Sequence, residues 1–425
     1  MKFTTIPQDI YENFIAHQKR VMFTQVPAYK RTREASGAKV EVLGVVEEAT
    51  GKVYGLALAS YQTWSRLFYR INIVYGPVFA DDAPLSARRL FYTGLKTHAK
   101  RNPRVISARI TPPEFRRVYD DVTPGHELAS ARELDQMITE LGGHRVVADF
   151  VTRGDIPITY SYMKEIGGLD FLAIQKSTGQ QVRTAFNRWG TNGVEVRFVD
   201  ANQIGILGKV LEHTAERTEM SEVSPGQLAY YKRLVEQFGP ENAFLPVAVL
   251  HCTNYLTQIR AERAEIEAKV ADLTARAREL EAAGKALGKK QKNQLKELQE
   301  RLAVLGRRED ETRSVQAAHG DEVVLAASLF VRSRNELLYL VSGAYAEFTS
   351  YYGIYLIHRA MFEWAAAHGV QWYNFYGISG DFSDTATDAG VLHFKRQFIG
   401  DVEEFVGTYD LPIRPRLAKT LKALD

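Results

Sequence analysis

The chain has 425 residues, of which 45% are hydrophobic and 25% are charged, and its formal net charge at pH 7 is +3. Such values are ordinary for folded proteins and exclude general disorder, while the length favours two or three domains over one. Because the total charge is close to zero, a uniformly basic or acidic binding surface is excluded, and any charged partner must meet a local cluster.

The N-terminal sequence, MKFTTIPQDIYENF, lacks an apolar stretch followed by a small-residue cleavage site. No apolar run approaches the roughly 20 residues that a membrane-spanning helix needs. Cys252 is the single cysteine and cannot form an intramolecular disulfide, which fits a reducing compartment. We therefore expect a cytoplasmic protein, for which peripheral contact with the inner face of the membrane stays open.

The first half of the chain shows a meander of strands, then a helix, then one further strand. A helix is expected around residues 10–17, and residues 23–33 then mix aromatic side chains with lysine and arginine. Gly51 allows a tight reversal between the first two strands of the meander. The apolar patterns predict strands at 40–47, 53–61 and 68–75, a helix at 86–100 and a strand at 105–110.

The same order of elements returns in the second half of the chain. We interpret this repeat as an internal duplication of one α+β unit. The copies differ mainly in the connection between their first two strands, which is a short turn in the first copy and a long insertion in the second. The second copy is predicted to consist of strands at 244–252, 323–331 and 337–341, a helix at 350–368 and a strand at 370–375.

The insertion carries the pattern of two helices that pack against each other. Its apolar residues recur in the rhythm of a helical seam. Between the two helices, Gly284 and Gly288 relax the chain enough for it to reverse. Because the insertion leaves and rejoins adjacent strands, we predict an antiparallel coiled-coil arm at residues 255–316. The seam positions are Ile259, Arg263 as the one polar break, Ile266, Val270, Leu273, Ala277, Leu280, Leu295, Leu298, Leu302 and Leu305.

The tip of the predicted arm is basic. No acidic residue occurs between Glu281 and Glu297. Cations at a projecting tip suit the phosphates of a nucleic acid, which attract positive charge without any reading of sequence. Charge runs are also common on solvated helix turns, so a structural arm or a dimer clasp stays open. The cations are Lys285, Lys289, Lys290, Lys292 and Lys296.

Residues 371–407 have the features of a reactive loop. An aromatic strand, 372–376, runs into a polar loop, after which Lys395 and Arg396 stand between two phenylalanines. Loops at the ends of strands hold chemical groups in place while substrates still reach them. We interpret this stretch as the reacting end of a transferase, with a plain strand-to-helix connection as the alternative.

Tyrosines are dense in the second half of the chain. A tyrosine combines an apolar body with a polar tip, which suits a groove that holds a peptide or a sugar. Most of them are expected in the core. Tyr339 and Tyr376 stand at predicted strand ends and are the better candidates for exposure.

Several familiar catalytic motifs are absent from the sequence. Without HExxH, CxxC, GxxxxGK[ST] or GxSxG, zinc hydrolases, nucleotide phosphohydrolases and serine hydrolases lose their main support. The histidines lack ligand spacing, so we expect neither a metal nor another cofactor. The acyl-CoA-binding turn of acetyltransferases is not evident, and Gly343-Ala344-Tyr345 stands in its place.

Five segments in the same order resemble the FemABX aminoacyltransferases. They are Phe23-Thr24-Gln25 with Tyr29, Gly76-Pro77-Val78, and residues 373–380, 390–398 and 403–407. The resemblance covers nearly the whole chain, the arm included. It implies an α+β fold of two GNAT-like (acetyltransferase-like) domains, with the coiled-coil arm inserted in the second. The implied domains are residues 1–152 plus 402–425 and residues 153–401.

The resemblance also implies a function. Members of this family move an amino acid from aminoacyl-tRNA to the stem-peptide side-chain amine of a peptidoglycan precursor, which is lipid II or UDP-MurNAc-pentapeptide, and so build the interpeptide bridge. The arm-tip lysines Lys285, Lys289, Lys290 and Lys292 would then contact the tRNA. Two alternatives stay open: an acyl-CoA-dependent GNAT N-acyltransferase, and a non-catalytic coiled-coil adaptor that binds RNA or a partner helix.

Matched by position, Lys395 and its neighbour Phe394 correspond to the family's catalytic FK pair beside the reacting ester. The chemistry is aminolysis of an activated ester, so we expect Lys395 to stabilise negative charge on the carbonyl oxygen. Asp381 is a weaker candidate for a base.

The resemblance assigns the acceptor side as well. Tyr230 and Tyr339 match tyrosines that line the precursor site, and Arg31, or Lys30 one place earlier, matches the residue that meets the diphosphate. Tyr376, at its strand end, is a further candidate for substrate binding. Two positions depart from the family pattern. Thr111-Pro112 replaces an Asp-Pro of some relatives. An arginine expected before Tyr230 is missing, so Arg217 or Arg233 would share phosphate binding.

Overall fold

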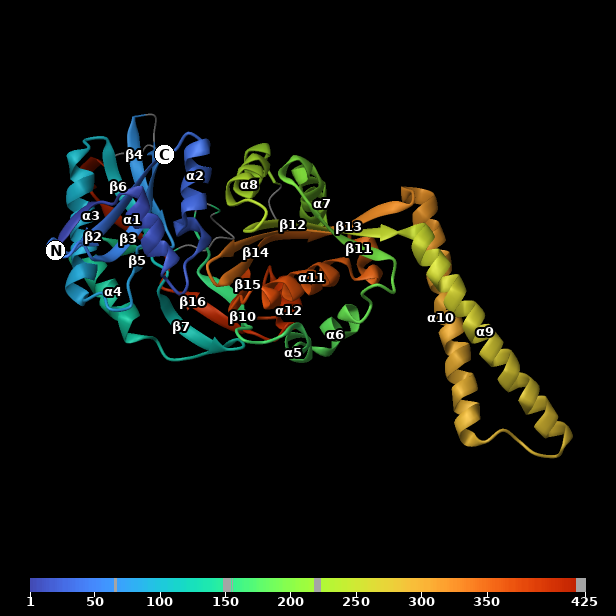
Figure 1. Ribbon diagram of the computed structural model, residues 1–425. Helices are drawn as coiled ribbons and strands as arrows, with labels where there is room; N and C mark the ends of the chain where they lie inside the picture. Colours follow the sequence, from blue (N-terminus) through green and yellow to red (C-terminus); the bar gives the residue numbers. More distant parts are fainter. Residues whose placement is uncertain (65–66, 148–153, 155, 218–222, 418–425) are drawn as a thin grey trace.

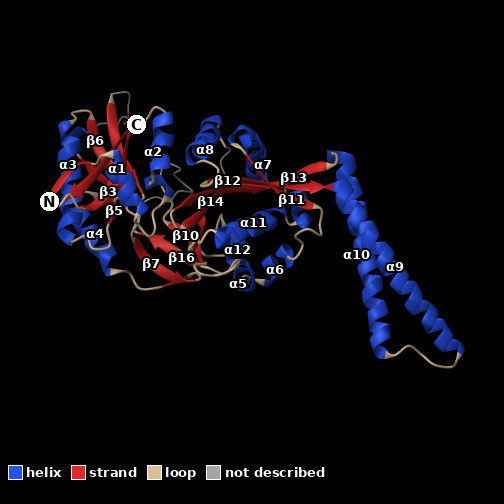
Figure 2. Ribbon diagram, in the orientation of Figure 1, coloured by secondary structure: helices blue, strands red, loops and turns tan. Residues whose placement is uncertain are grey.

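The structure is a computed structural model that describes the chain except for residues 65–66, 148–153, 155, 218–222 and 418–425. Its described strands form two mixed sheets, one of eight strands and one of nine, and helices cover the faces of both (Figures 1 and 2). A hairpin of two long helices projects from the second sheet (Figure 1). The architecture is α+β, as predicted.

The first sheet contains the first copy of the repeated unit. Its β4 and β6 run parallel, because α3 (Leu85–Arg101) carries the chain back along the sheet between them. The inward face of α3 buries Phe91 and Leu95 against the sheet. In spatial order the strands are β1 (Lys2–Thr5), β2 (Lys39–Val46), β3 (Val53–Trp64), β4 (Phe68–Val74), β6 (Val105–Thr111), β17 (Tyr409–Pro412) and β9 (His144–Arg145), with β5 (Val78–Phe79) beside β3.

The second sheet contains the second copy with the same connections. Its parallel pair is β14 and β15, and α11 (Gly353–Ala367) lies between them in the chain. The repeated order of meander, helix and parallel strand is confirmed. The strands in spatial order are β11 (Val194–Val199), β12 (Ala243–His251), β13 (Glu322–Ser333), β14 (Glu336–Ala344), β15 (Trp372–Ile378), β10 (Tyr160–Glu165), β16 (Asp401–Phe405), β7 (Phe115–Asp120) and β8 (Thr123–Pro124).

The chain crosses between the two sheets more than once. β7 and β8 belong to the stretch 1–152 but extend the second sheet, and β16 joins them there before β17 returns to the first sheet. One apolar cluster also contains Leu56 of β3 and Leu329 of β13, so the halves share part of their core. The domain limits 1–152 plus 402–425 and 153–401 remain a proposal.

Helices on opposite faces of the second sheet separate two environments. One face packs against α7 and α8, and the other packs against α11, with α5, α6 and α12 beside it (Figure 1). α2 lies against α8 at the joint between the halves. The remaining helices are α1 (Gln8–Ala16), η1 (Phe23–Gln25), α2 (Pro27–Ala35), α4 (Ala129–Glu140), α5 (Phe171–Lys176), α6 (Gln180–Phe186), η2 (Ala201–Gln203), α7 (Ile204–Arg217), α8 (Pro225–Phe238), η3 (Ala346–Tyr351) and α12 (Ala389–Arg396).

The arm is the antiparallel pair α9 (Cys252–Ala282) and α10 (Lys289–His319). Both helices extend slightly beyond the predicted limits 255–316, and Cys252 begins α9 instead of ending a strand. Ile259, Ile266 and Leu305 are buried in the seam. Among the described residues, no helix combines the length and apolar character that crossing a bilayer requires.

Candidate active site

Lys395 lies in the last turn of α12 and points into the protein. The inner face of this short helix buries Leu392 and Lys395, three residues apart, and the lysine is only 5% exposed. Its Nζ donates hydrogen bonds to the carbonyl oxygens of Gly377 at 2.6 Å and of Tyr376 at 3.3 Å. The amine therefore sits at the end of β15, where the sequence predicted the reacting end.

Burial lowers the pKa of Lys395 to about 7, and the nearby carboxylate of Asp388 partly opposes this shift. Asp388 is held in place by Ser379, whose backbone N–H and Oγ donate to its two oxygens at 2.7 and 2.6 Å. An ammonium has three N–H donors and a neutral amine has two. With two donors engaged by the carbonyls, only the protonated lysine keeps one for a further acceptor.

Aromatic side chains surround the amine on its inner side. His358 of α11 is fully buried, and its Nδ1 lies 2.7 Å from the Tyr373 hydroxyl. Burial, with the neighbouring Lys395, lowers the pKa of His358 to about 3, so the ring is neutral. Its centroid lies 5.6 Å from that of Phe394 and 4.7 Å from that of Phe398. Phe394 is thus a wall of this apolar enclosure.

Tyr376, near the end of β15, contacts Lys395 through its backbone and a second tyrosine through its side chain. Its φ of 64° is in the left-handed region, which for a residue with a side chain costs roughly 1–2 kcal/mol. The carbonyl of Tyr376 faces Lys395, while its hydroxyl pairs with that of Tyr75. The loop beyond it needs a glycine at position 380, because a Cβ there would meet the ring of Tyr160 at 2.3 Å.

Four tyrosines from both halves of the chain meet at this joint. Tyr29 of α2 pairs with Tyr230 of α8, Tyr75 follows β4 and pairs with Tyr376, and Tyr376 contributes to the raised pKa of Tyr230. Burial raises the pKa of all four, so their hydroxyls stay neutral. We call these four residues the tyrosine cluster. It brings together the predicted Tyr230 and Tyr376.

Cations lie on the same two helices as the tyrosine cluster. Arg31 is exposed on α2, and one of its Nη atoms donates to the Gln237 carbonyl of α8 at 3.0 Å. Lys30 pairs with Glu34 at 2.8 Å. On α8, the Nε of half-buried Arg233 has no hydrogen-bond partner among the described residues. The side chain of Arg217 lies outside what the structure describes.

Two sequence expectations change in the structure. Tyr339 was expected to be exposed, but it is 7% exposed, because β14 is an inner strand and α11 covers its face. Its ring lies 4.5 Å from that of His358. Asp381 is exposed on the loop, and a hydrogen bond from Ser383 lowers its pKa, which weakens it as a base. Asp388, just before α12, is the carboxylate beside Lys395, and the sequence analysis missed it.

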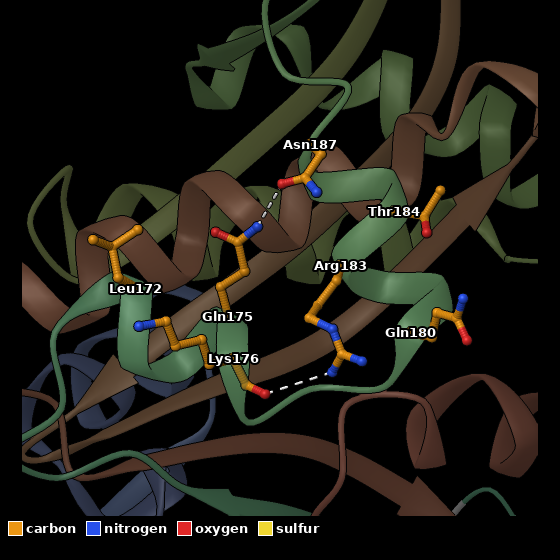
Figure 3. Close-up of a pocket in the computed structure, with 7 residues that line it drawn as sticks. All are labelled: Leu172, Gln175, Lys176, Gln180, Arg183, Thr184 and Asn187. Atoms are coloured by element: carbon orange, nitrogen blue, oxygen red, sulfur yellow. Dashed lines mark hydrogen bonds between the residues drawn. The ribbon is translucent and has the colours of Figure 1, made fainter. Parts of the chain in front are cut away.

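A cationic pocket lies between α5 and α6 on the α12 side of the sheet (Figure 3). Its volume is about 510 Å³, and among the described residues that line it none is acidic. Lys176 is exposed at its rim. The Gly179 N–H donates to the Gln397 carbonyl at 2.8 Å, so the turn between α5 and α6 is fastened to the end of α12. The lining residues are Leu172, Gln175, Lys176, Gln180, Arg183, Thr184 and Asn187.

The arm-tip lysines lie far from this site. Lys285, Lys289, Lys290 and Lys292 are all exposed, at the end of the hairpin that is remote from both sheets (Figure 1). The structure therefore separates a cationic tip from a cationic pocket.

The chain thus combines a repeated α+β unit, a buried amine at one strand end and a joint lined by tyrosines behind it. The match of residues 6–425 to the model of the FemAB family shows that the chain belongs to this family. It is 24% identical over 430 residues to the aminoacyltransferase FemA of Staphylococcus epidermidis, covering 100% of both chains. It is 30% identical over 233 residues to the aminoacyltransferase FemA of Staphylococcus aureus, covering 55% of this chain and 53% of that one.

The fold has a close counterpart among solved structures. The crystal structure of FemX superposes with a TM-score of 0.75 and 17% identity, covering 99% of each chain. The family and its curated members identify the chain as an aminoacyltransferase.

Proposed function

We propose that this aminoacyltransferase takes an amino acid from an aminoacyl-tRNA and joins it to the stem-peptide side-chain amine of a peptidoglycan precursor in the cytoplasm. The acceptor is lipid II, met at the inner face of the membrane, or its soluble precursor UDP-MurNAc-pentapeptide. The observation that carries the proposal is the placement of Tyr376, which has Lys395 at its carbonyl and the tyrosine cluster at its side chain. Two substrates can thus meet at one strand end.

The reaction is the aminolysis of an ester. The neutral acceptor amine attacks the aminoacyl carbonyl carbon, a C–N bond forms, and the bond to the ribose oxygen breaks. The remaining N–H of protonated Lys395 stabilises the oxyanion of the tetrahedral intermediate. The proton lost by the attacking amine goes to the departing ribose oxygen. Because the ester is already activated, orientation of the two substrates supplies much of the acceleration.

The joint between α2 and α8 suits the precursor. Neutral tyrosines offer flat apolar faces and hydroxyls for a sugar or a peptide. Arg31 and Arg233 add positive charge on the same helices for a diphosphate, with Lys30 held by Glu34. Tyr339 is not part of this surface, and we assign it to the support of His358.

The opposite side of the second sheet suits the RNA donor. The pocket between α5 and α6 contains Lys176 and Arg183, and a backbone hydrogen bond links it to the end of α12. These cations can bind RNA phosphates near the reacting ester. The arm tip supplies a second cationic surface for a distant part of the same RNA. Two cationic surfaces this far apart fit a long RNA better than the small acyl-CoA of the alternative (Figure 1).

Neutralising the arm tip should weaken tRNA binding. For Lys285→Gln, Lys289→Gln and Lys290→Gln combined, the slope of log affinity against log salt is expected to flatten by about 2 to 3, because each lost duplex contact removes roughly 0.9. The measurement is a filter-binding titration over salt concentration. The matched control changes Lys269, Arg276 and Arg278 of the stem to glutamine. An equal effect of both sets would assign the tip no specific contact.

Neutralising the pocket should have a smaller effect of the same kind. Lys176→Gln is expected to flatten the salt slope by about 0.7, the share of one phosphate in a single strand. Lys209→Gln, on α7 at the other face of the sheet, removes the same charge and should leave the slope unchanged. If Lys176→Gln and Lys209→Gln gave the same salt slope, the pocket would have no part in RNA binding.

The direct test of the proposed function uses the purified protein, charged tRNA pools, and lipid II or UDP-MurNAc-pentapeptide. Mass spectrometry of the precursor should show the mass of one added amino acid and identify it. Acyl-CoA without tRNA should give neither product nor thioester consumption. Turnover with acyl-CoA alone would overturn the proposal in favour of the N-acyltransferase alternative.

A further inference from the structure

A buried chain of polar contacts begins at Arg20, in the segment between α1 and η1. The Nε of Arg20 donates to Glu336 at the start of β14, and its two Nη atoms donate to Glu403 of β16 at 2.8 Å each. The guanidinium also lies 5.4 Å from the ring centroids of Phe115 and Trp372. Arg20 thus fastens the N-terminal segment to the second sheet.

The chain continues from Glu336 to Asn374 in the middle of β15. The Nδ2 of Asn374 donates to the other carboxylate oxygen of Glu336 at 2.7 Å. Its Oδ1 accepts two hydrogen bonds of 2.7 Å, one from the Ser161 hydroxyl and one from the backbone N–H of Tyr376. Asn374 and Ser161 are both completely buried. The side chain of Asn374 is therefore held on three sides.

The contact between Asn374 and Tyr376 bears on the active site. When an asparagine oxygen accepts a hydrogen bond from the N–H two residues later, a local turn forms. Here the turn anchors the backbone N–H of Tyr376, a residue whose φ of 64° lies in the left-handed region. The next carbonyls along the chain, those of Tyr376 and Gly377, are the acceptors of Lys395. A change at Asn374 would therefore move the acceptors that locate the amine.

We propose that Asn374 is a positioning residue for aminoacyl transfer, which sets the place of the Lys395 amine through the backbone of Tyr376 and is itself set by Glu336 and Arg20. The inference rests on the proposed function, since it assumes that Lys395 acts in the transfer. Glu403 provides the comparison, because it binds the same Arg20 but makes no described contact with Asn374.

The test compares Asn374→Ala with Asn374→Ser. Both variants lose the bond to Glu336, but only serine keeps an oxygen that accepts the Tyr376 N–H. Asn374→Ala is expected to lower kcat at least tenfold with an unchanged KM for the precursor, and Asn374→Ser should recover most of that loss. Glu403→Gln should leave kcat within about twofold, although it removes a buried partner of Arg20.

A pH profile separates positioning from a merely structural role. Among the residues that the structure describes, the charged or titratable groups coupled to Lys395 are Asp388, which acts on it, and His358, on which it acts. In a plot of kcat against pH, the titration of Lys395 gives an inflection. In Asn374→Ala this inflection should move to lower pH, because the ammonium loses carbonyl acceptors that favour its charged form. In Glu403→Gln it should stay in place. Equal kcat and equal inflection in these two variants would overturn the inference.

Two precautions keep the outcomes distinct. If Asn374→Ala does not fold, Glu336→Gln is used in its place. This variant weakens the link between Asn374 and Arg20 but keeps an oxygen that accepts from Asn374. It is compared with Glu403→Gln in the same way. The wild-type protein with charged tRNA is run in parallel. Failure of wild-type transfer would count against the proposed function, whereas normal transfer with an indifferent Asn374→Ala would count only against this inference.

Discussion

Lys395→Met is expected to lower the rate of aminoacyl transfer by about a hundredfold or more, the usual loss when one oxyanion donor is removed. Methionine fills most of the same volume but cannot donate a hydrogen bond. The measurement is a single-turnover assay with charged tRNA and precursor, together with thermal unfolding to show that the fold survives. Arg396→Met is the matched control. That neighbouring arginine is bonded to Asp121 at the surface, and its loss should have little effect on the rate.

The same pair of proteins tests which form of Lys395 acts. The ratio of the wild-type rate to the Lys395→Met rate removes the pH dependence of the acceptor amine, which both proteins share. Because burial lowers the pKa of Lys395 to about 7, the donating ammonium is present below that pH and disappears above it. The ratio should be largest in acid and decline as the pH rises through about 7. A ratio that instead grows with pH would assign the neutral amine the role of a base.

Arg20→Met is expected to destabilise the fold by about 3–5 kcal/mol at pH 8, the effect of breaking a buried ion pair by removing one partner. The reason is that Glu336 and Glu403, whose side chains are 3% and 13% exposed, would remain as two buried carboxylates without a cation. The measurement is the free energy of unfolding from denaturant titration. Lys19→Met is the control, since the adjacent Lys19 is solvent-exposed and its pair with Asp81 is a surface one.

The pH dependence of this loss has a definite sign. Burial already raises the pKa of Glu403 in the wild-type protein, and Arg20 opposes that shift. Without Arg20 the folded-state pKa of Glu403 should rise further above the unfolded value. Such groups favour folding when they bind protons, so the variant regains stability as the pH falls. The gap to the wild type should be smaller at pH 5 than at pH 8, and a constant gap would contradict the assignment.

Much of the fold could be predicted because its signals are local. The strands of both copies follow apolar patterns a few residues long, and the arm follows a helical repeat that is read without knowledge of any distant residue. The order of elements then revealed the duplication, and the structure confirms it through the parallel pairs β4 with β6 and β14 with β15. The exchange of β7 and β16 into the second sheet left no such signal, because strand pairing depends on residues far apart in the chain.

The candidate active site also has features that the sequence indicated and features that only the structure shows. The residue types and their order singled out Lys395, the loop before it and Tyr376 as candidates, whereas Tyr230 became a candidate only through the resemblance to the FemABX family. The surroundings of these residues could not be predicted from the sequence. Tyr339 looked like the end of a strand, but the strands on both sides of β14 and the helix above it make it a core residue. Asp388 gave only the weak signal of an acid before a helix.

The sequence by itself determined the repeated unit, the arm with its basic tip and the position of the candidate lysine, since each depends on neighbouring residues alone. Only the tertiary structure decided that this lysine is buried against two carbonyls, with a depressed pKa, and that Asn374, Glu336 and Arg20 form a chain leading to it. The reason is physical. Desolvation and hydrogen-bond geometry arise from which surfaces come together, and residues 20, 336 and 374 meet only once both halves have folded.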